Sequence, residues 1–297
     1  MITLRPYQET SVNEIRTALA KYCRVLFQLP TAGGKTIIFS YIAQTSAKYN
    51  RKVLILSSRT EILQQNGGAL ERMGIDVAYI NPKARKVPEA RVCCGMAQTL
   101  RRRVEKEDWQ EFLKTVELVI IDECHETVSD FVHEFLAPKC FVLGVTGTPR
   151  RYGNMGQLGS LYKAMVIGVS VKELEDLGYL STATHYSIAC PKLEDIPIDG
   201  GVGDFRQKLL AQAYENKMMY TGVVSEYMRL CPNTKALCFC VSAKQAIEVT
   251  KEFLLNGIEA RYLLSGSFDS DEMYSGERSD VIDDFKANKF KVLVNVS

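Results

Sequence analysis

The sequence has 297 residues, of which 37 are Lys or Arg and 35 are Asp or Glu, so its net charge is +2. Hydrophobic residues make up 46% and charged residues 24%, which excludes a disordered or collagen-like chain. The balanced charge excludes a binder saturated with positive charge, but a local basic groove stays open. At roughly 150 residues per domain, the length predicts about two domains.

Short, continuous apolar runs recur in the first part of the chain. Runs that do not alternate with polar residues are typical of strands covered on both faces, as in a parallel sheet. Amphipathic stretches of helical length separate them, including Thr60–Arg72 and Gln98–Lys114. This alternation predicts an α/β domain with right-handed crossovers. The predicted strands are Val25–Leu29, Val53–Leu56, Val77–Ile80, Leu118–Ile121 and Phe141–Val145.

The pattern changes after Phe141–Val145. Residues Tyr152 to Gly168 are rich in glycine, and we expect them to be irregular. A short helix is predicted at Val171–Leu177, and a second α/β unit follows, so we place domains at 1–183 and 184–297. In the second unit we expect helices at Phe205–Met228, Ala243–Leu255 and Glu277–Ala287 around a loop at Pro197–Gly203, and strands at Ala236–Cys240, Ala260–Leu264 and Lys291–Val296.

A glycine-rich turn, Pro30–Thr36, follows the first predicted strand and precedes an apolar helix pattern. Its two glycines let backbone amides face a phosphate, and the start of the helix carries partial positive charge. Lys35 would reach the β and γ phosphates, and the Thr36 hydroxyl would hold Mg²⁺. The strict Walker pattern has glycine where Leu29 stands, so a β–α turn with a surface lysine is the alternative.

Two carboxylates end the buried run Leu118–Ile121, in Asp122-Glu123-Cys124-His125. Ligands of α/β sheets bind at the carboxyl ends of the strands. Asp122 would hold Mg²⁺, and Glu123 would orient or deprotonate an attacking water. Taken alone, such a pair is also common at the start of a helix.

These motifs, in this order, resemble the superfamily 2 helicases, the DEAD/DEAH-like group in its DECH form. Pro30–Thr36 resembles motif I, Asp122–His125 motif II and Gly144–Arg150 motif III. Gly178-Tyr179-Leu180 and Phe285–Asn295 are most similar to the RadD, XPB and phage-type repair helicases. The resemblance implies a RecA-like parallel-sheet domain followed by an incomplete second RecA-like domain. It also implies ATP and Mg²⁺ as cofactors and nucleic acid, DNA rather than RNA, as partner.

The resemblance assigns roles around the nucleotide. Leu4–Gln8 resembles the adenine-reading motif, although a proline-initiated helix start is the alternative. Family members usually have glycine where this chain has Ala32. Thr146 and Thr148 would link hydrolysis to domain movement, and His125 would couple the site to the second domain. The implied catalytic residues are Lys35, Asp122 and Glu123, and the implied nucleotide-binding residues are Arg5, Gln8, Thr31, Ala32, Gly33, Gly34, Lys35, Thr36 and His125.

Nucleic-acid contacts would go to the phosphate backbone. Val53–Gln65 resembles motif Ia, the segment around Gln98 motif Ib, and Leu237–Ser242 motif IV. A basic cluster at Lys83–Arg91 is either a further patch or a solvated loop. The implied contacts are Arg59, Gln98, Thr99, Arg101 and Ser242.

Motifs V and VI of the family are absent from this sequence and are expected beyond Ser297. One of them supplies arginines that stabilise charge on the γ-phosphate. For residues 1–297 we therefore expect nucleotide binding with little hydrolysis until a further segment or a partner chain completes the site. The leading hypothesis is an ATP-dependent helicase or translocase. The alternative is a catalytically incomplete module that binds nucleotide or nucleic acid and acts through a partner.

Membrane, export and metal signals are lacking. Met1–Gln8 contains no apolar run, and no segment reaches the roughly 18 apolar residues of a membrane span, so we expect a cytoplasmic protein. The nine cysteines form no Cys-x-x-Cys pair, so we expect reduced, buried thiols rather than a zinc site. They are Cys23, Cys93, Cys94, Cys124, Cys140, Cys190, Cys231, Cys238 and Cys240.

Overall fold

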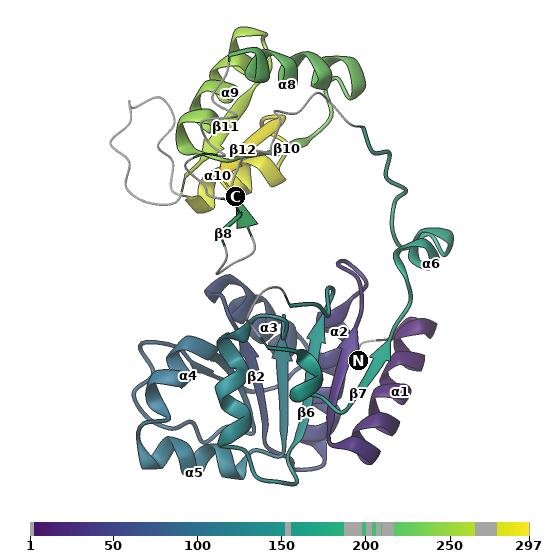
Figure 1. The fold of residues 1–297 in the computed structure, drawn as a ribbon, viewed down its shortest axis with the longest axis vertical. Helices are drawn as coiled ribbons and strands as arrows, with labels where there is room; N and C mark the ends of the chain where they lie inside the picture. The colour runs from purple at the N-terminus through teal and green to yellow at the C-terminus, as the bar shows by residue number, and fades with distance from the viewer. Residues whose placement is uncertain are drawn as a thin grey trace. The chain divides into compact units, whose positions relative to one another are not determined.

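The computed structural model is an α/β protein that divides into two compact units, Met1–His185 and Tyr186–Ser297 (Figure 1). It describes residues 3–151, 156–186, 198–199, 204–205, 209, 217–264 and 278–296. No helix in these ranges is long and apolar enough to cross a membrane.

A parallel sheet of seven strands, in the order β3-β4-β2-β5-β6-β1-β7, forms the centre of the first unit. Every strand predicted for this part of the chain is present, with ends that differ by one residue at most. The strands are β1 (Arg24–Gln28), β2 (Val53–Ser57), β3 (Val77–Ile80), β4 (Val92–Met96), β5 (Leu118–Asp122), β6 (Phe141–Thr146) and β7 (Ala164–Ile167).

Three expectations for this unit are wrong. β7 lies within Tyr152–Gly168, which we expected to be irregular; it is an edge strand that pairs only with β1, and Met165 and Ile167 are exposed on it. β4 was not predicted, because its sequence contains glycine and two cysteines rather than a long branched apolar run. The helix expected over Gln98–Lys114 is two helices, α4 (Ala97–Arg103) and α5 (Glu107–Thr115).

Successive strand residues face opposite sides of the sheet, and each side is covered by its own helices. Phe27, Ile55 and Ile120 face one helical layer, whereas Leu54 and Val119 face the other. The first layer consists of α1 (Pro6–Tyr22), α2 (Lys35–Lys48) and α3 (Thr60–Arg72), and the second of α4, α5 and the 3-10 helices η1 (Thr127–Glu134) and η2 (Leu158–Ser160). Both faces of the central strands are thus closed to water, and Trp109 of α5 is fully buried.

The second unit contains a three-stranded parallel sheet in the order β10-β12-β11. The helix expected from Phe205 is wrong at its start, because Phe205 belongs to a short antiparallel strand pair; most of residues 206–216 lie outside the described ranges. The other predicted strands and helices are present within a residue or so at each end. Two short strands were not predicted: β8 (Ile198–Asp199), which lies in the expected loop Pro197–Gly203, and β9 (Asp204–Phe205). The other elements are α8 (Lys217–Leu230), β10 (Ala236–Cys240), α9 (Ala243–Leu255), β11 (Ala260–Leu263), α10 (Arg278–Lys286) and β12 (Val292–Val296).

The short helix α6 (Val171–Asp176) follows β7, and its first turn explains why it begins there. The Ser170 side chain accepts a hydrogen bond from the Glu173 amide at 3.2 Å, and Glu173 accepts one from the Ser170 amide at 2.7 Å. This reciprocal cap satisfies amides that the helix itself leaves without partners. Tyr179 follows α6 after Leu177 and Gly178.

The cysteines of the described residues are all free, and Cys190 lies outside those residues. Four of them pack among the strands and helices of the first unit. Burial raises the pKa of Cys93 to about 11 and those of Cys94, Cys124 and Cys140 to about 12. These thiols therefore stay protonated at neutral pH.

His133 in η1 is a buried base without a described hydrogen-bond partner on either ring nitrogen. Its ring packs edge-on against Tyr162, with centroids 5.7 Å apart. Burial, and then the charge of Arg24, lower the pKa of His133 to about 4. The folded protein therefore binds one proton fewer than the unfolded chain between this value and about pH 6.5.

We predict that acidification lowers the free energy of unfolding of the wild-type protein, because His133 must be protonated in the unfolded chain and stays neutral in the fold. Because the folded-state pKa is lowered, this stability is present above about pH 6.5 and is lost as pH falls toward 4; by pH 4.5 the loss is about 2 to 3 kcal/mol. His133→Phe should lack this part of the acid sensitivity, and His185→Phe, at an exposed histidine, should retain it. Urea denaturation at pH 7 and 4.5 measures it, and equal losses in both variants would contradict the assignment.

Candidate active site

The site is built at the carboxyl edge of three neighbouring strands. β5, β6 and β1 lie side by side, with Asp122 in register with Val145 and Gln28 in register with Thr146. All three strands run in the same direction, so the segments that follow them leave the sheet at one edge. These segments are the glycine-rich turn, Asp122–His125 and Thr146–Arg150, which are far apart in the sequence.

The glycine-rich turn connects β1 to α2 through left-handed backbone. Gly34 has φ of 88° and Ala32 has φ of 63°. A Cβ on Gly34 would lie 2.5 Å from Nε2 of Gln8, so only glycine fits at this position. Gly33 is buried, whereas Thr31 and Ala32 are exposed at the start of α2. The first amides of this 14-residue helix remain available to an anion.

Residues 4–8, which resemble the adenine-reading motif, pack directly against this turn. The Arg5 amide donates to Oε1 of Gln8 at 2.9 Å, and the Tyr7 hydroxyl donates to the Gly33 carbonyl at 2.9 Å. The Arg5 guanidinium carbon lies 4.0 Å from the ring centroid of Tyr179, whose ring centroid is 5.5 Å from that of Tyr7. Sequence reasoning missed the hydrogen bond of Tyr7 to Gly33 and the contact of the Tyr179 ring with Arg5. Pro6 opens α1, and Gln8 faces the turn, so these residues begin a helix and also lie beside the proposed phosphate site.

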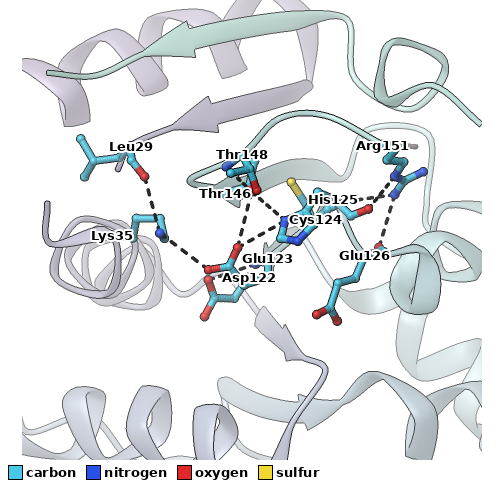
Figure 2. A network of polar contacts seen from close by, with 10 residues as sticks. All are labelled: Leu29, Lys35, Asp122, Glu123, Cys124, His125, Glu126, Thr146, Thr148 and Arg151. Carbon is cyan, nitrogen blue, oxygen red and sulfur yellow. Dashed lines mark hydrogen bonds and ion pairs between the residues drawn. The ribbon is translucent and has the colours of Figure 1, made fainter. Parts of the chain in front are cut away.

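Lys35, at the start of α2, forms an ion pair with Glu123. Glu123 belongs to the segment Asp122–His125, which we call the acidic box. Nζ of Lys35 lies 3.6 Å from Oε1 of Glu123 and 3.5 Å from the Leu29 carbonyl oxygen (Figure 2). Its side chain is 12% exposed, which shields the pair partly from water. A Cβ on Gly147 would lie 3.4 Å from Nζ, an ordinary contact distance, so alanine would also fit at this position.

Asp122 is 8% exposed at the end of β5. Its Oδ2 accepts a hydrogen bond from Nδ2 of Asn66 at 3.0 Å, and its Oδ1 accepts one from the Glu123 amide at 3.1 Å. The pKa of Asp122 is raised, mainly because the carboxylate is buried, and the nearby charge of Glu123 adds to this effect. The hydrogen bond from Asn66 and the charge of Lys35 lower the pKa, but they do not cancel the effect of burial. A buried carboxylate with a raised pKa gains from a bound cation, and oxygen ligands suit Mg²⁺.

Asn66 is a site residue that sequence reasoning missed. It is 1% exposed on α3, and Nδ2 also donates to the Ser57 hydroxyl at 3.1 Å. It lies on the buried face of α3 together with Leu63 and Leu70. A single asparagine among apolar residues at helical spacing is the signal that could have identified it.

His125 and Thr146 hold the second oxygen of Glu123. Nδ1 of His125 lies 2.8 Å from Oγ1 of Thr146 and 3.3 Å from Oε2 of Glu123. The Thr146 hydroxyl lies 3.4 Å from the same Oε2 and accepts a hydrogen bond from the Thr148 amide at 3.0 Å (Figure 2). If the Thr146 proton goes to Glu123, the His125 proton resides on Nδ1. The acidic box and Thr146–Thr148 therefore form one network.

The proposed nucleic-acid residues of the first unit follow β2 and β4. Arg59 is exposed at the N-cap of α3, and Gln98 and Arg101 are exposed on α4. Nε2 of Gln98 donates to the Ser58 carbonyl at 2.8 Å, which joins the two segments. Thr99 is 8% exposed, so its side chain packs inside rather than at the surface.

The remaining basic residues near α4 differ in their surroundings. Arg103 lies 4.9 Å from the Trp109 ring centroid and donates to the Asn81 carbonyl at 3.1 Å, so it does not simply face water.

In the second unit, Ser242 caps α9 by accepting a hydrogen bond from the Gln245 amide at 3.1 Å. That contact gives Ser242 a structural role at the end of β10.

Comparisons with known sequences identify related proteins. Residues 1–151 match the family described as "Type III restriction enzyme, res subunit" (ResIII). The "51.5 kDa protein" of Lactococcus phage (isolate 7-9) is 25% identical over 276 residues, covering 91% of this chain and 54% of that protein. The "Putative ATP-dependent helicase IRC3" of Saccharomyces cerevisiae is 27% identical over 318 residues, covering 98% of this chain and 44% of that protein. The chain spans about half the length of the curated relatives that it matches.

Solved structures share this fold. The Hef helicase domain of Pyrococcus furiosus has a TM-score of 0.58 at 16% identity, covering 98% of this chain and 85% of that chain. Dbp5 of S. cerevisiae, bound to RNA and ADP BeF3, has a TM-score of 0.54 at 16% identity, covering 99% and 74%. At such identities the likeness shows the fold alone, whereas the family match extends over more than half of the chain. The chain therefore belongs to the ResIII family and has the RecA-like fold of the superfamily 2 helicases.

Proposed function

We propose that this chain provides the nucleotide-hydrolysing core of an ATP-dependent helicase or translocase that moves along the phosphate backbone of nucleic acid. The observation that carries the proposal is the convergence of Lys35, Asp122, Glu123 and Thr146 at one edge of the sheet. The ResIII family and the helicase relatives support it. The restriction-enzyme description of the family and the resemblance to repair helicases favour DNA over RNA. Free cysteines favour a cytoplasmic location.

Binding begins at the glycine-rich turn in this proposal. The amides at the start of α2 bind phosphate oxygens, and Lys35 exchanges its contact with Glu123 for the β and γ phosphates. Arg5 and Gln8 contact the adenine, and the Tyr7–Gly33 hydrogen bond keeps them in register with the turn. Bound Mg²⁺, held by Thr36 and Asp122, would neutralise phosphate charge.

Hydrolysis needs a base or an orienting group for water, and Glu123 fits that role. Once Lys35 turns to the phosphates, Oε1 of Glu123 is released to accept a hydrogen bond from water. Its Oε2 stays fixed by Thr146 and His125. Movement of Thr146 or His125 would therefore shift Glu123, which supports a coupling role for these residues and for Thr148.

We predict that Lys35→Ala lowers affinity for ATP by roughly tenfold or more, because a partly buried ammonium no longer faces the phosphates. Lys48→Ala, at the exposed end of the same helix, is the control and should bind as wild type does. Equilibrium binding of a fluorescent ATP analogue measures both. Equal affinity in Lys35→Ala and wild type would place the phosphates elsewhere.

In a chain extended through motifs V and VI, we predict that Glu123→Gln keeps ATP binding within about twofold and lowers hydrolysis by roughly 10²-fold or more, since an amide is a poor base. Glu126→Gln makes the same change three residues away, and no contact drawn in Figure 2 joins the Glu126 carboxylate to Glu123. Single-turnover hydrolysis with enzyme in excess measures the loss, and normal turnover in Glu123→Gln would exclude its role. If the wild-type protein binds ATP tightly but does not hydrolyse it, with or without DNA, the result would favour the alternative of a binding module that acts through a partner.

We predict that Arg59→Ala and Arg101→Ala each reduce the salt dependence of nucleic-acid binding by about one unit of log K against log salt. The control is Arg51→Ala, because Arg51 is exposed at the opposite end of β2 from Arg59. Titration of labelled single-stranded DNA and RNA at several salt concentrations gives the slopes and tests the preference for DNA. An unchanged slope in both variants would move the interface away from α3 and α4.

A further inference from the structure

The loop after Glu123 contains strained backbone and needs support. Glu123 has φ of 49°, a left-handed conformation that residues with side chains rarely adopt. The chain then folds back, with the Cys124 amide donating to the Val145 carbonyl at 3.1 Å and the Glu126 amide to the Glu123 carbonyl at 3.0 Å. Such a conformation persists only where its surroundings fix it.

The Arg151 guanidinium gathers the carbonyl oxygens of this loop. Nε donates to the carbonyl of His125 at 2.8 Å, and Nη2 donates to those of Cys124 at 3.0 Å and Glu126 at 3.3 Å (Figure 2). The Arg151 side chain is 4% exposed. A planar group with five N–H donors is suited to several carbonyls at once, and a lysine ammonium is not.

Asp130 in η1 holds Arg151 from the other side. Nη1 donates to Oδ2 at 2.9 Å, and Nη2 donates to Oδ1 at 2.8 Å, a two-point contact that sets the plane of the guanidinium. The carboxylate also compensates the charge of a nearly buried arginine. Its side chain is 32% exposed, so the pair lies at the margin of the interior.

Arg151 follows β6 and the segment that contains Thr146 and Thr148. His125 is therefore held twice by one stretch of chain: its ring by Thr146 and its carbonyl by Arg151. Any displacement of residues 146–151 would therefore move both the ring and the carbonyl group of His125. The acidic box can keep its geometry only while this stretch stays in place.

We propose that Arg151, oriented by Asp130, is a positioning residue that fixes Glu123 and His125 for hydrolysis. The proposal rests on the proposed function for its catalytic consequence. Arg151 touches backbone oxygens of the loop and not the reacting atoms. Its loss should therefore lower turnover, while the phosphate contacts of Lys35 and the glycine-rich turn, and hence ATP affinity, stay in place.

The test compares Arg151→Gln, Arg151→Lys and Asp130→Asn with wild type, each in a chain extended through motifs V and VI. Arg151→Gln should lower kcat about ten- to a hundredfold, with ATP affinity changed less than about twofold. Arg151→Lys should have a higher kcat than Arg151→Gln but a lower one than wild type. Asp130→Asn should lower kcat less than Arg151→Gln does, because the contacts of Arg151 with the carbonyl oxygens remain. Arg261→Gln is the control, since it removes an arginine–aspartate contact of 2.7 Å to Asp284 in the second unit and should keep kcat.

A second readout does not depend on hydrolysis. Nitrogen NMR of the histidine rings should show the His125 proton on Nδ1 in wild type and a shifted or averaged His125 signal in Arg151→Gln, with exposed His185 unchanged. If Arg151→Gln does not fold, Asp130→Asn and Arg151→Lys carry both measurements.

The outcomes separate the two proposals. Wild-type kcat together with an unchanged His125 signal in the variants would overturn the role of Arg151, and so would equal losses of kcat and ATP affinity. If wild type extended through motifs V and VI binds ATP but does not hydrolyse it, the proposed function fails, and the His125 signal alone still decides whether Arg151 positions the loop.

Discussion

The parallel alignment of β5, β6 and β1 is the constraint on which the site depends. Neighbouring parallel strands deliver their carboxyl ends to one edge at a spacing of about 4.8 Å, so side chains that follow them are within reach of each other. Lys35 and Glu123 meet across that edge, and Thr146 lies on the strand between them. The buried registers fix these distances, because slipping one strand by a residue would turn its apolar side chains to the wrong face.

Each charged group at this edge has a partner in the absence of a ligand. Lys35 pairs with Glu123, and buried Asp122 relies on an amide from Asn66. Triphosphate and Mg²⁺ would change the partners of all three groups, since the phosphates attract the ammonium and the cation attracts the carboxylate. Binding is then an exchange of partners among preformed contacts, which keeps the cost of rearrangement small.

Local signals in the sequence predicted most of the fold and the first contacts of the site. Branched apolar runs identified the central strands, and the motifs Pro30–Thr36 and Asp122–His125 identified the segments that meet at the edge of the sheet. β7 was missed because an edge strand is covered on one side only and lies in a glycine-rich segment. Asn66 and Arg151 were missed for another reason: their partners, Asp122 and residues 124–126, come near only when α3 and the turn after β6 are folded.

The backbone conformation shows where this fold departs from local preference. Among described non-glycine residues with positive φ, three are asparagines, which tolerate this region, and a fourth, Cys23, follows α1. The other two, Ala32 and Glu123, both belong to the site. A left-handed residue with a side chain costs roughly 1 to 2 kcal/mol, so both segments need outside support. Tyr7 holds the turn at Gly33, and Arg151 holds the loop after Glu123. Both supports come from segments outside the turn and the acidic box, so displacement of either segment would change the conformation that positions Lys35 and Glu123.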